Sequence, residues 1–364
     1  MGKNLTEEAI LSALSKIQDP GLRKDLVALD SISDLKIKGD EVTLKLVLVT
    51  PAHPHAQQIE NEIRQTLEKG GARKVSIEIA AEVPSDGRPR TGSAAEVKNT
   101  IAVASGKGGV GKSTVAANIA VALAMAGARV GLLDADVYGP NIPTMMGVDH
   151  LPKPPDASGR LVPAEAYGVK LMSIGFLVKP EQAMVWRGPM LHNAIRQFVN
   201  DVEWGELDYL IVDMPPGTGD VQLSLAQTTP LSGGLIVTLP QKVSVDDARR
   251  GMEMFRQLRV PLTGVVENMS YLETQDGKRI DVFGSGGGEA LAKEFDVPFI
   301  GSIPLEPEVR VGGDIGKPIV ISKPASAAAK ALTAIAGKLS LSASAAAIAA
   351  QSQSIPIKIV DEKM

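Results

Sequence analysis

Cysteine is absent from this 364-residue chain, and aromatic residues make up only 3% of it. Without cysteine the chain can form no disulfide, no thiolate nucleophile and no cysteine-ligated zinc or iron–sulfur centre of its own. Long hydrophobic runs are also missing, because the most apolar uncharged stretch, residues 114–128, is too short to span a bilayer. Glu7, Glu8 and Lys16 interrupt the N-terminal apolar positions, so no signal peptide is indicated. We therefore expect a cytoplasmic protein with no membrane partner.

Charge of one sign is not in large excess either. The formal net charge is −4, from 38 basic and 42 acidic residues, which gives no general attraction to nucleic acid. A hydrophobic content of 44% is typical of globular proteins, and the length is sufficient for two domains. We therefore expect a globular protein with no nucleic-acid partner.

What the chain does have is a glycine-rich stretch between an apolar run, residues 101–104, and an alanine-rich run of helix formers, residues 115–125. This strand, loop and helix context is typical of a phosphate-binding P-loop. Glycines let backbone N–H groups approach phosphate oxygens, and the helix N-terminus adds partial positive charge. The alternative is a glycine-rich turn with incidental lysines. The predicted ATP-binding residues are Gly106, Lys107, Gly108, Gly109, Val110, Gly111, Lys112, Ser113 and Thr114.

Within this loop, Lys112 is expected to reach the β- and γ-phosphates as a catalytic residue, and the Ser113 hydroxyl to bind Mg²⁺. Asp213 ends another apolar run, residues 207–212, in the form of a Walker B aspartate, so we expect it to reach the same Mg²⁺. Gly217, in the turn that follows, can offer its backbone N–H to the γ-phosphate as part of a switch loop.

Asp134 and Asp136 follow the apolar run at residues 129–133, one strand after the P-loop. Carboxylates at the end of a strand beside a phosphate loop can orient water or hold the Mg²⁺ shell. The alternative is an aspartate-rich turn that caps the next element.

Periodicity and composition divide the chain into four parts. Residues 1–83 show the order α-β-β-α-β, which predicts a small α/β domain with helices on one face of a sheet. Residues 84–98 are rich in proline, glycine and serine and predict a linker that lets this domain move. Residues 99–340 form the larger domain, in which an alanine-rich closing helix is expected to end near Leu339. Residues 341–364 are predicted to be a low-complexity tail.

The larger domain alternates apolar runs with helical segments such as 243–258 and 289–295. Continuous apolar runs bounded by glycine and proline favour strands buried on both faces of a parallel sheet. The fold class predicted is α/β: a doubly wound, mostly parallel P-loop NTPase domain preceded by the small α/β domain. The candidate strands are residues 101–104, 129–133, 170–174, 209–212, 235–239, 262–267 and 299–300.

The pattern KGGxGK[ST] at residues 107–113 and DxPPGTGD at 213–220 resemble the MinD/ParA/Mrp branch of P-loop NTPases, and in particular its Mrp/ApbC group. The resemblance implies a homodimer in which Lys107 reaches the partner's nucleotide as a catalytic residue. It also implies that Asp136 positions the attacking water, that Asp134 belongs to the Mg²⁺ shell and that Asn268 reads the adenine edge. The alternatives are a solvated lysine on the loop rim and an asparagine that only ends a strand.

The small domain resembles the PaaD/SufT-type iron–sulfur assembly domains, through Asp19-Pro20, residues 25–27 and the stretch Thr50-Pro51-Ala52-His53-Pro54. In that family the position of His53 is usually cysteine. His53 and His55 together are a candidate metal pair, and the alternative is a pair of polar residues at a helix entry.

Mrp-like proteins carry Cys-x-x-Cys after the Asn-Met-Ser stretch, and two such pairs bridge a 4Fe-4S cluster across the dimer. Here residues 272–279 hold no cysteine, and Thr274 stands roughly where the first would be. The resemblance therefore implies a cluster whose usual ligands are missing.

The function predicted is that of a dimeric ATPase switch in iron–sulfur cluster assembly or transfer, with scaffold or client apoproteins as partners. The alternatives are a MinD/ParA-like positioning or adaptor protein without a cluster, and a metabolic ATPase or kinase.

Overall fold

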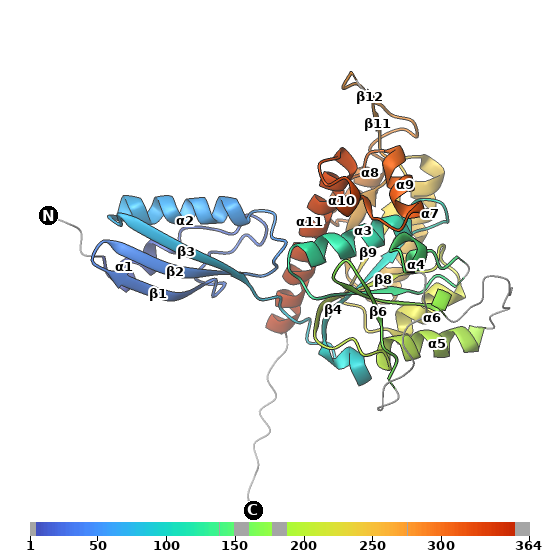
Figure 1. The fold of residues 1–364 in the computed structure, drawn as a ribbon, viewed down its shortest axis with the longest axis horizontal. Coiled ribbons are helices and arrows are strands. Elements are labelled where there is room, and N and C mark those ends of the chain that lie inside the picture. Colours follow the sequence, from blue (N-terminus) through green and yellow to red (C-terminus); the bar gives the residue numbers. More distant parts are fainter. Residues whose placement is uncertain (1–4, 138, 149–159, 177–187, 275, 354–364) are drawn as a thin grey trace, which may run out of the picture.

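The computed structural model describes residues 5–137, 139–148, 160–176, 188–274 and 276–353. Two hydrophobic cores are present, one in a small N-terminal domain and one in a larger domain that carries the P-loop. Figure 1 shows the small domain beside the larger one, with the last helix of the chain where they meet.

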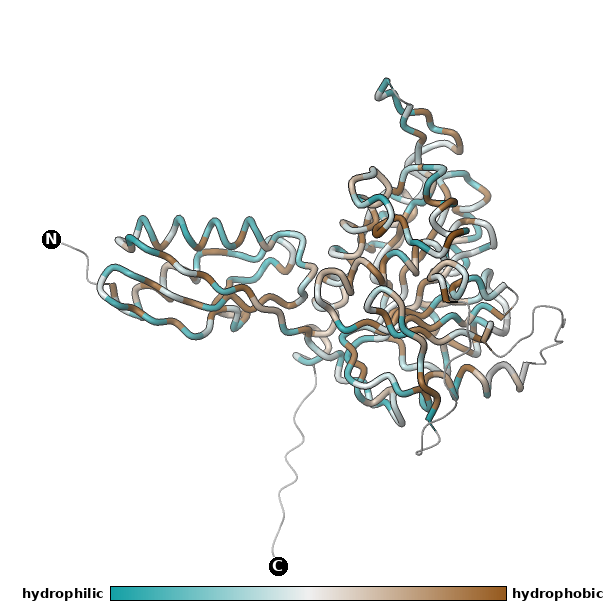
Figure 2. The backbone as a smooth tube through the Cα atoms, viewed as in Figure 1, coloured by the Kyte–Doolittle hydropathy of each residue, from teal (hydrophilic) through white to brown (hydrophobic). Residues whose placement is uncertain are grey.

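The small domain has the predicted order of elements. They are α1 (Glu7–Leu14), β1 (Ile32–Lys38), β2 (Glu41–Leu48), α2 (Ala56–Gly70) and β3 (Lys74–Ala81). β1 pairs with β2 in an antiparallel hairpin whose turn is the predicted Gly39-Asp40, and β3 lies parallel to β2. The Thr6 side chain accepts the Ala9 N–H at 3.3 Å, as expected of the helix cap. Ile59, Ile63 and Leu67 of α2 are buried, and Figure 2 shows the rest of this helix as largely hydrophilic.

The larger domain is built on an eight-stranded sheet of order β13-β10-β9-β4-β8-β5-β7-β6. All seven predicted strands are present and parallel to one another, which confirms the fold class. The eighth strand, β6, was not predicted because three residues are too short for a periodic pattern, and it pairs antiparallel at the edge. The strands are β4 (Val97–Ala104), β5 (Val130–Asp134), β6 (Ala164–Ala166), β7 (Val169–Ser173), β8 (Leu207–Asp213), β9 (Gly233–Thr238), β10 (Leu262–Glu267) and β13 (Phe299–Ser302).

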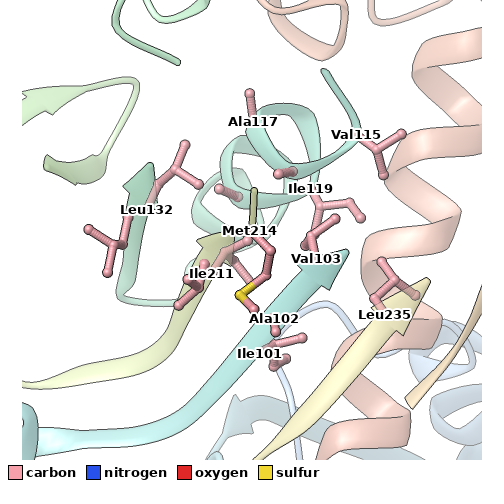
Figure 3. Packing of buried hydrophobic residues seen from close by; sticks show 14 of the residues in the cluster. Ile101, Ala102, Val103, Val115, Ala117, Ile119, Leu132, Ile211, Met214 and Leu235 are labelled. Carbon is pink, nitrogen blue, oxygen red and sulfur yellow. The ribbon is translucent and has the colours of Figure 1, made fainter. Parts of the chain in front are cut away.

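Helices cover the sheet and connect its strands (Figure 1). The helices are α3 (Lys112–Met125), α4 (Ile142–Met145), α5 (Gly188–Asn200), α6 (Asp220–Thr228), α7 (Lys242–Gln257), α8 (Gly287–Glu294), α9 (Pro307–Asp314), α10 (Ile319–Ser322) and α11 (Ala327–Gln353). The remaining elements are two 3-10 helices, η1 (Gly92–Glu96) and η2 (Ile174–Phe176), and a small hairpin of β11 (Leu272–Glu273) and β12 (Arg279–Ile280). The core lies between sheet and helices: Figure 3 shows Val115 and Ile119 of α3 near Val103 of β4.

α11 continues past the predicted end of the closing helix. Residues 341–353 are helical, so the expected tail begins no earlier than residue 354, outside the described residues. The serines and alanines that give this stretch its low-complexity composition pack closely against the small domain. Ser340 accepts a hydrogen bond from the Thr50 hydroxyl at 3.0 Å, and Ser344 donates one to the Val49 carbonyl at 3.0 Å. Small side chains therefore let this helix approach the small domain.

Length and apolar composition alone would let α11 cross a membrane, and it is the one such helix among the described residues. However, 56% of its most apolar window is buried inside the protein, where the helix packs on α3 and β13. The helix is thus part of the core.

The predicted linker is fastened to the larger domain. The Arg90 guanidinium donates two hydrogen bonds of 2.7 Å to the Asp86 carboxylate, and the Ser232 hydroxyl donates a third at 2.6 Å. Both charged side chains are buried. These contacts hold the segment in one place, in contrast to the mobile connection that its composition predicts.

Candidate nucleotide-binding site

The P-loop leaves the carboxyl end of β4, between β8 and β9, and enters α3. Its first glycine is pressed against α7: a Cβ added at Gly106 would lie 2.0 Å from the backbone carbonyl carbon of Asp247. Gly111 has a φ of +82°, and a Cβ there would lie 2.3 Å from Nδ2 of Asn268. The backbone of α7 excludes a side chain at Gly106, and the left-handed φ favours glycine at Gly111, so the loop shape depends on these two glycines.

Lys112 brings three of the predicted site residues together. Its ammonium lies 2.7 Å from Oδ1 of Asp213, 3.2 Å from Oγ of Ser113 and 3.7 Å from Oδ2 of Asp136. Only 5% of the Lys112 side chain is exposed, so it is held next to the carboxylates with little water to screen its charge.

Asp213 is fully buried and keeps one oxygen, Oδ2, without a hydrogen-bond partner among the described residues. Burial raises the pKa of its carboxyl group, although the neighbouring Lys112 opposes that shift. A buried carboxylate oxygen left without a donor, close to a serine hydroxyl, fits the hard oxygen ligands that Mg²⁺ prefers. The chemistry of Asp213 and Ser113 is therefore compatible with the predicted metal.

Asp134 is placed differently. Its Oδ2 accepts hydrogen bonds from the Ser173 hydroxyl at 2.8 Å and the Ile142 N–H at 3.3 Å, and its Oδ1 accepts one from the Asp136 N–H at 3.2 Å. Burial, followed by the charge of Asp213, raises the pKa of Asp134 to about 8. Both oxygens therefore accept hydrogen bonds that stabilise the turn after β5. This is the alternative interpretation, in which the aspartate caps the next element. A place in the Mg²⁺ shell remains a prediction for this residue.

Gly217 and Lys107 lie on the loops around the site. The Gly217 N–H donates to the Ser105 carbonyl at 3.1 Å, so it must leave this bond before it can meet a γ-phosphate. Lys107 is half-buried, and its ammonium has no partner within the part of the chain that the structure describes. The residue is thus available for the predicted reach toward a second protomer.

Asn268 lines a pocket of about 330 Å³ next to the P-loop. Its side-chain amide donates to the Val110 carbonyl at 2.8 Å, so in this structure it supports the loop directly. The far wall comes from the segment after β13 and from α9, which no motif had indicated. Its members are Ile303, Pro304, Leu305, Glu306, Val309, Arg310, Gly313 and Asp314.

In the small domain, His53 faces Asp19 rather than a metal. Nε2 of His53 lies 2.9 Å from Oδ2 of Asp19, and both side chains are buried. Burial opposes ionisation of Asp19, but the contact with His53 and the Leu22 N–H outweigh it and hold the pKa of this carboxyl below its usual value. Nδ1 of His53 accepts the His55 N–H at 3.2 Å. His53 and His55 thus lie at the entry of α2, as the alternative interpretation predicts, with His53 buried against Asp19. No group of three possible metal ligands occurs among the described residues.

The β11–β12 hairpin includes Thr274, where the resemblance to Mrp-like proteins predicts the first cysteine. The Thr274 hydroxyl donates to the Asp276 carboxylate at 2.5 Å, and the Thr274 N–H donates to the Lys278 carbonyl at 2.9 Å. Hydroxyl and carboxylate oxygens are poor ligands for iron–sulfur clusters. The described residues of the turn between β11 and β12 are thus polar, with no soft ligand among them.

Known proteins resemble the chain over nearly its whole length. The family model described as NUBPL iron-transfer P-loop NTPase matches residues 96–340, and the one described as iron-sulfur cluster assembly protein matches residues 7–79. An iron-sulfur cluster carrier protein of Synechocystis is 52% identical over 348 residues, which is 93% of this chain and 99% of that protein.

Two solved structures resemble the larger domain. A nucleotide-binding protein from Archaeoglobus fulgidus in complex with ADP has a TM-score of 0.55 and 38% identity, covering 61% of this chain and 88% of that chain. The cell division ATPase MinD of Pyrococcus furiosus has a TM-score of 0.52 and 25% identity, covering 66% of this chain and 97% of that chain.

Proposed function

This chain belongs to the NUBPL iron-transfer P-loop NTPases, and from that premise we propose that it is a Mg²⁺-dependent ATPase acting in iron–sulfur cluster assembly or transfer. The observation that carries the proposal is the meeting of Lys112, Asp213 and Asp136 within 3.7 Å, at the end of the glycine loop. The ADP complex of the archaeal neighbour supports nucleotide binding in this fold.

The chemistry proposed is phosphoryl transfer from ATP to water. The backbone N–H groups of the P-loop and the Lys112 ammonium bind the phosphates and stabilise the charge that develops on the γ-phosphoryl oxygens. Asp136 orients the attacking water. Mg²⁺ bound by Ser113 and Asp213 would neutralise further phosphate charge. ATP binding draws Lys112 away from Asp213, which frees that carboxylate.

The pocket beside Asn268 is proposed to hold the adenine and ribose. It adjoins Gly111 and Thr114 of the P-loop, so a nucleotide whose phosphates lie in the loop would extend into it. Its lining is mainly apolar, which suits a purine ring, while the Asn268 amide supplies hydrogen-bonding groups.

Hydrolysis is proposed to require a homodimer, because Lys107 has no partner among the described residues of its own protomer and stands at the rim of the loop. The output is proposed to be a conformational change that scaffold or client apoproteins recognise. Since the chain has no cysteine, the thiolate ligands of the transferred cluster come from those partners. The chain then serves as an ATP-driven adaptor.

Anaerobic reconstitution with iron and sulfide, followed by absorption and Mössbauer spectroscopy, tests the adaptor role. We expect no stoichiometric cluster on the chain alone, and transfer between a cluster-loaded scaffold and an apoprotein to accelerate when the chain and ATP are added. A stoichiometric cluster on the isolated chain would contradict the adaptor role and favour a carrier with non-cysteine ligands. ATP turnover without any effect on transfer would favour a positioning ATPase.

A further inference from the structure

Glu267 is a buried carboxylate that the proposed hydrolysis does not use. It ends β10 and is 2% exposed. Among the described residues no basic side chain pairs with it, so its charge must be stabilised by hydrogen-bond donors alone.

Those donors belong to the two ends of one hairpin. The Ser270 hydroxyl donates to Oε1 of Glu267, the Gly286 N–H donates to the same oxygen at 3.3 Å, and the Gly288 N–H donates to Oε2 at 2.7 Å. Ser270 directly precedes the hairpin segment, residues 271–274 and 276–285, and Gly286 directly follows it. One carboxylate therefore fastens both ends of the hairpin that projects from the body in Figure 1.

Gly287 and Gly288, which follow the hairpin, lie close to the residues at the ends of β9 and β10. A Cβ added at Gly288 would lie 3.0 Å from Cβ of Glu267, and one added at Gly287 would lie 2.3 Å from the Pro240 carbonyl oxygen. The N-terminus of α8 also directs its partial positive charge at the carboxylate. The exit of the hairpin and the start of α8 therefore both lie directly against the Glu267 side chain.

The next residue contacts the nucleotide site. Asn268 donates its side-chain amide to Val110 in the P-loop at 2.8 Å, and its backbone N–H to Thr238 of β9 at 2.8 Å. Glu267 and Asn268 are consecutive, so the contact with the P-loop and the contacts with the hairpin ends come from adjacent positions at the end of β10.

We propose that Glu267 is a positioning residue that couples nucleotide binding at the P-loop to the orientation of the β11–β12 hairpin. This inference rests on the proposed nucleotide site. The hairpin segment exposes Ile280 and Val282 by 49% and 46%, with Phe283 at 36%. The segment whose orientation is proposed to respond to nucleotide therefore carries exposed apolar side chains.

The test is hydrogen exchange, followed by mass spectrometry, over residues 271–286 of the full chain with and without a non-hydrolysable ATP analogue and Mg²⁺. The variants are Glu267→Gln, which places an amide N–H₂ against backbone donors, and Ser270→Ala, which removes only the bond at the hairpin entry. Glu289→Gln is the matched control, because it makes the same change at an exposed position in the first turn of α8.

In the wild-type chain we expect the analogue to change exchange across the hairpin. In Glu267→Gln that change should fall by at least about fivefold, in Ser270→Ala by less, and in Glu289→Gln it should stay at the wild-type level. Calorimetry should give all four proteins analogue affinities within about threefold of one another, which separates coupling from binding. If Glu267→Gln fails to fold, Ser270→Ala decides the question.

Two results would overturn the coupling alone. One is analogue binding to the wild-type chain without any change in hydrogen exchange of the hairpin. The other is a nucleotide-dependent change in exchange that is as large in Glu267→Gln and Ser270→Ala as in the wild type. Failure of the wild-type chain to bind any analogue would instead overturn the nucleotide site, and the coupling with it.

Discussion

At the scale of single residues, Lys112 is the group on which the site depends. Without nucleotide its ammonium is balanced by Asp213 at 2.7 Å and by Asp136 at 3.7 Å. Removing one partner of a buried charge pair leaves the other uncompensated. Substitutions of Lys112 should therefore affect both catalysis and the folded state, and stability must be measured beside turnover.

We expect Lys112→Ala to abolish ATP hydrolysis and Lys107→Ala to lower it strongly. If Lys107 acts on the partner's nucleotide, an equal mixture of the two variants should reach about a quarter of wild-type turnover, since half of randomly formed dimers are mixed and each contains one complete site. A phosphate-release assay at several protein concentrations measures this. Lys242→Ala, an exposed lysine on α7, is the control. No recovery on mixing would exclude the reach across the dimer.

The Asp19–His53 pair predicts a pH effect on the small domain. The pKa of Asp19 is lower in the folded state, so its contribution to stability is present above the unfolded value of 3.8 and is lost as pH falls through the folded value. Asp19→Asn should therefore lower the free energy of unfolding by about 3 kcal/mol at neutral pH and by progressively less below pH 4. Denaturant titrations at pH 7 and at pH 3 to 4 would detect this, and an equal loss at both values would contradict it.

At the scale of elements, the P-loop is shaped from outside by α7. The backbone of Asp247 leaves no room for a side chain at Gly106, whereas a Cβ at Gly108 would meet only Pro216, at 4.0 Å. The motif contains both glycines, but only one of them is required by packing in the nucleotide-free chain.

Gly106→Ala should therefore destabilise the protein by about 3 kcal/mol, because α7 or the loop must shift to admit the methyl group. Gly108→Ala should change stability by less than about 0.5 kcal/mol, as expected at a site without such contacts. Thermal unfolding without nucleotide compares the two. Equal melting temperatures would show that the loop does not rest on α7 as described.

At the scale of the whole molecule, α11 joins the two domains. It packs on α3, the helix that follows the P-loop, and on the small-domain loop that holds Thr50 and Ala52. A Cβ added at Gly337 would lie 2.6 Å from the Ala52 carbonyl oxygen. The loop carrying the assembly-domain motif is thus turned toward the ATPase domain.

Gly337→Ala should loosen this contact while leaving α11 itself intact, because alanine favours a helix. We expect the radius of gyration from small-angle scattering to increase and the two domains to unfold in separate steps. Lys338→Ala, an exposed change one residue further on, should behave like wild type. An unchanged scattering curve for Gly337→Ala would argue against α11 as the connection between domains.

The secondary-structure elements and the kind of site could be predicted from the amino-acid sequence. Apolar runs bounded by glycine predicted all seven parallel strands, because a strand buried on both faces needs little else. The P-loop and the strand-end aspartates marked the region where Lys112, Asp213 and Asp136 meet, since parallel strands bring their carboxyl ends to one edge of the sheet. The missing cysteines were equally plain from composition.

Contacts between residues far apart in the chain could be read only from the folded structure. Both oxygens of Asp134 accept hydrogen bonds from the turn after β5, and His53 lies against Asp19. Arg90 holds the linker, and α11 extends onto the small domain. None of these carries a local signal, because each depends on which surfaces meet after folding. Periodicity reports which face of an element is apolar, whereas the partner of a buried polar group is fixed by packing in three dimensions.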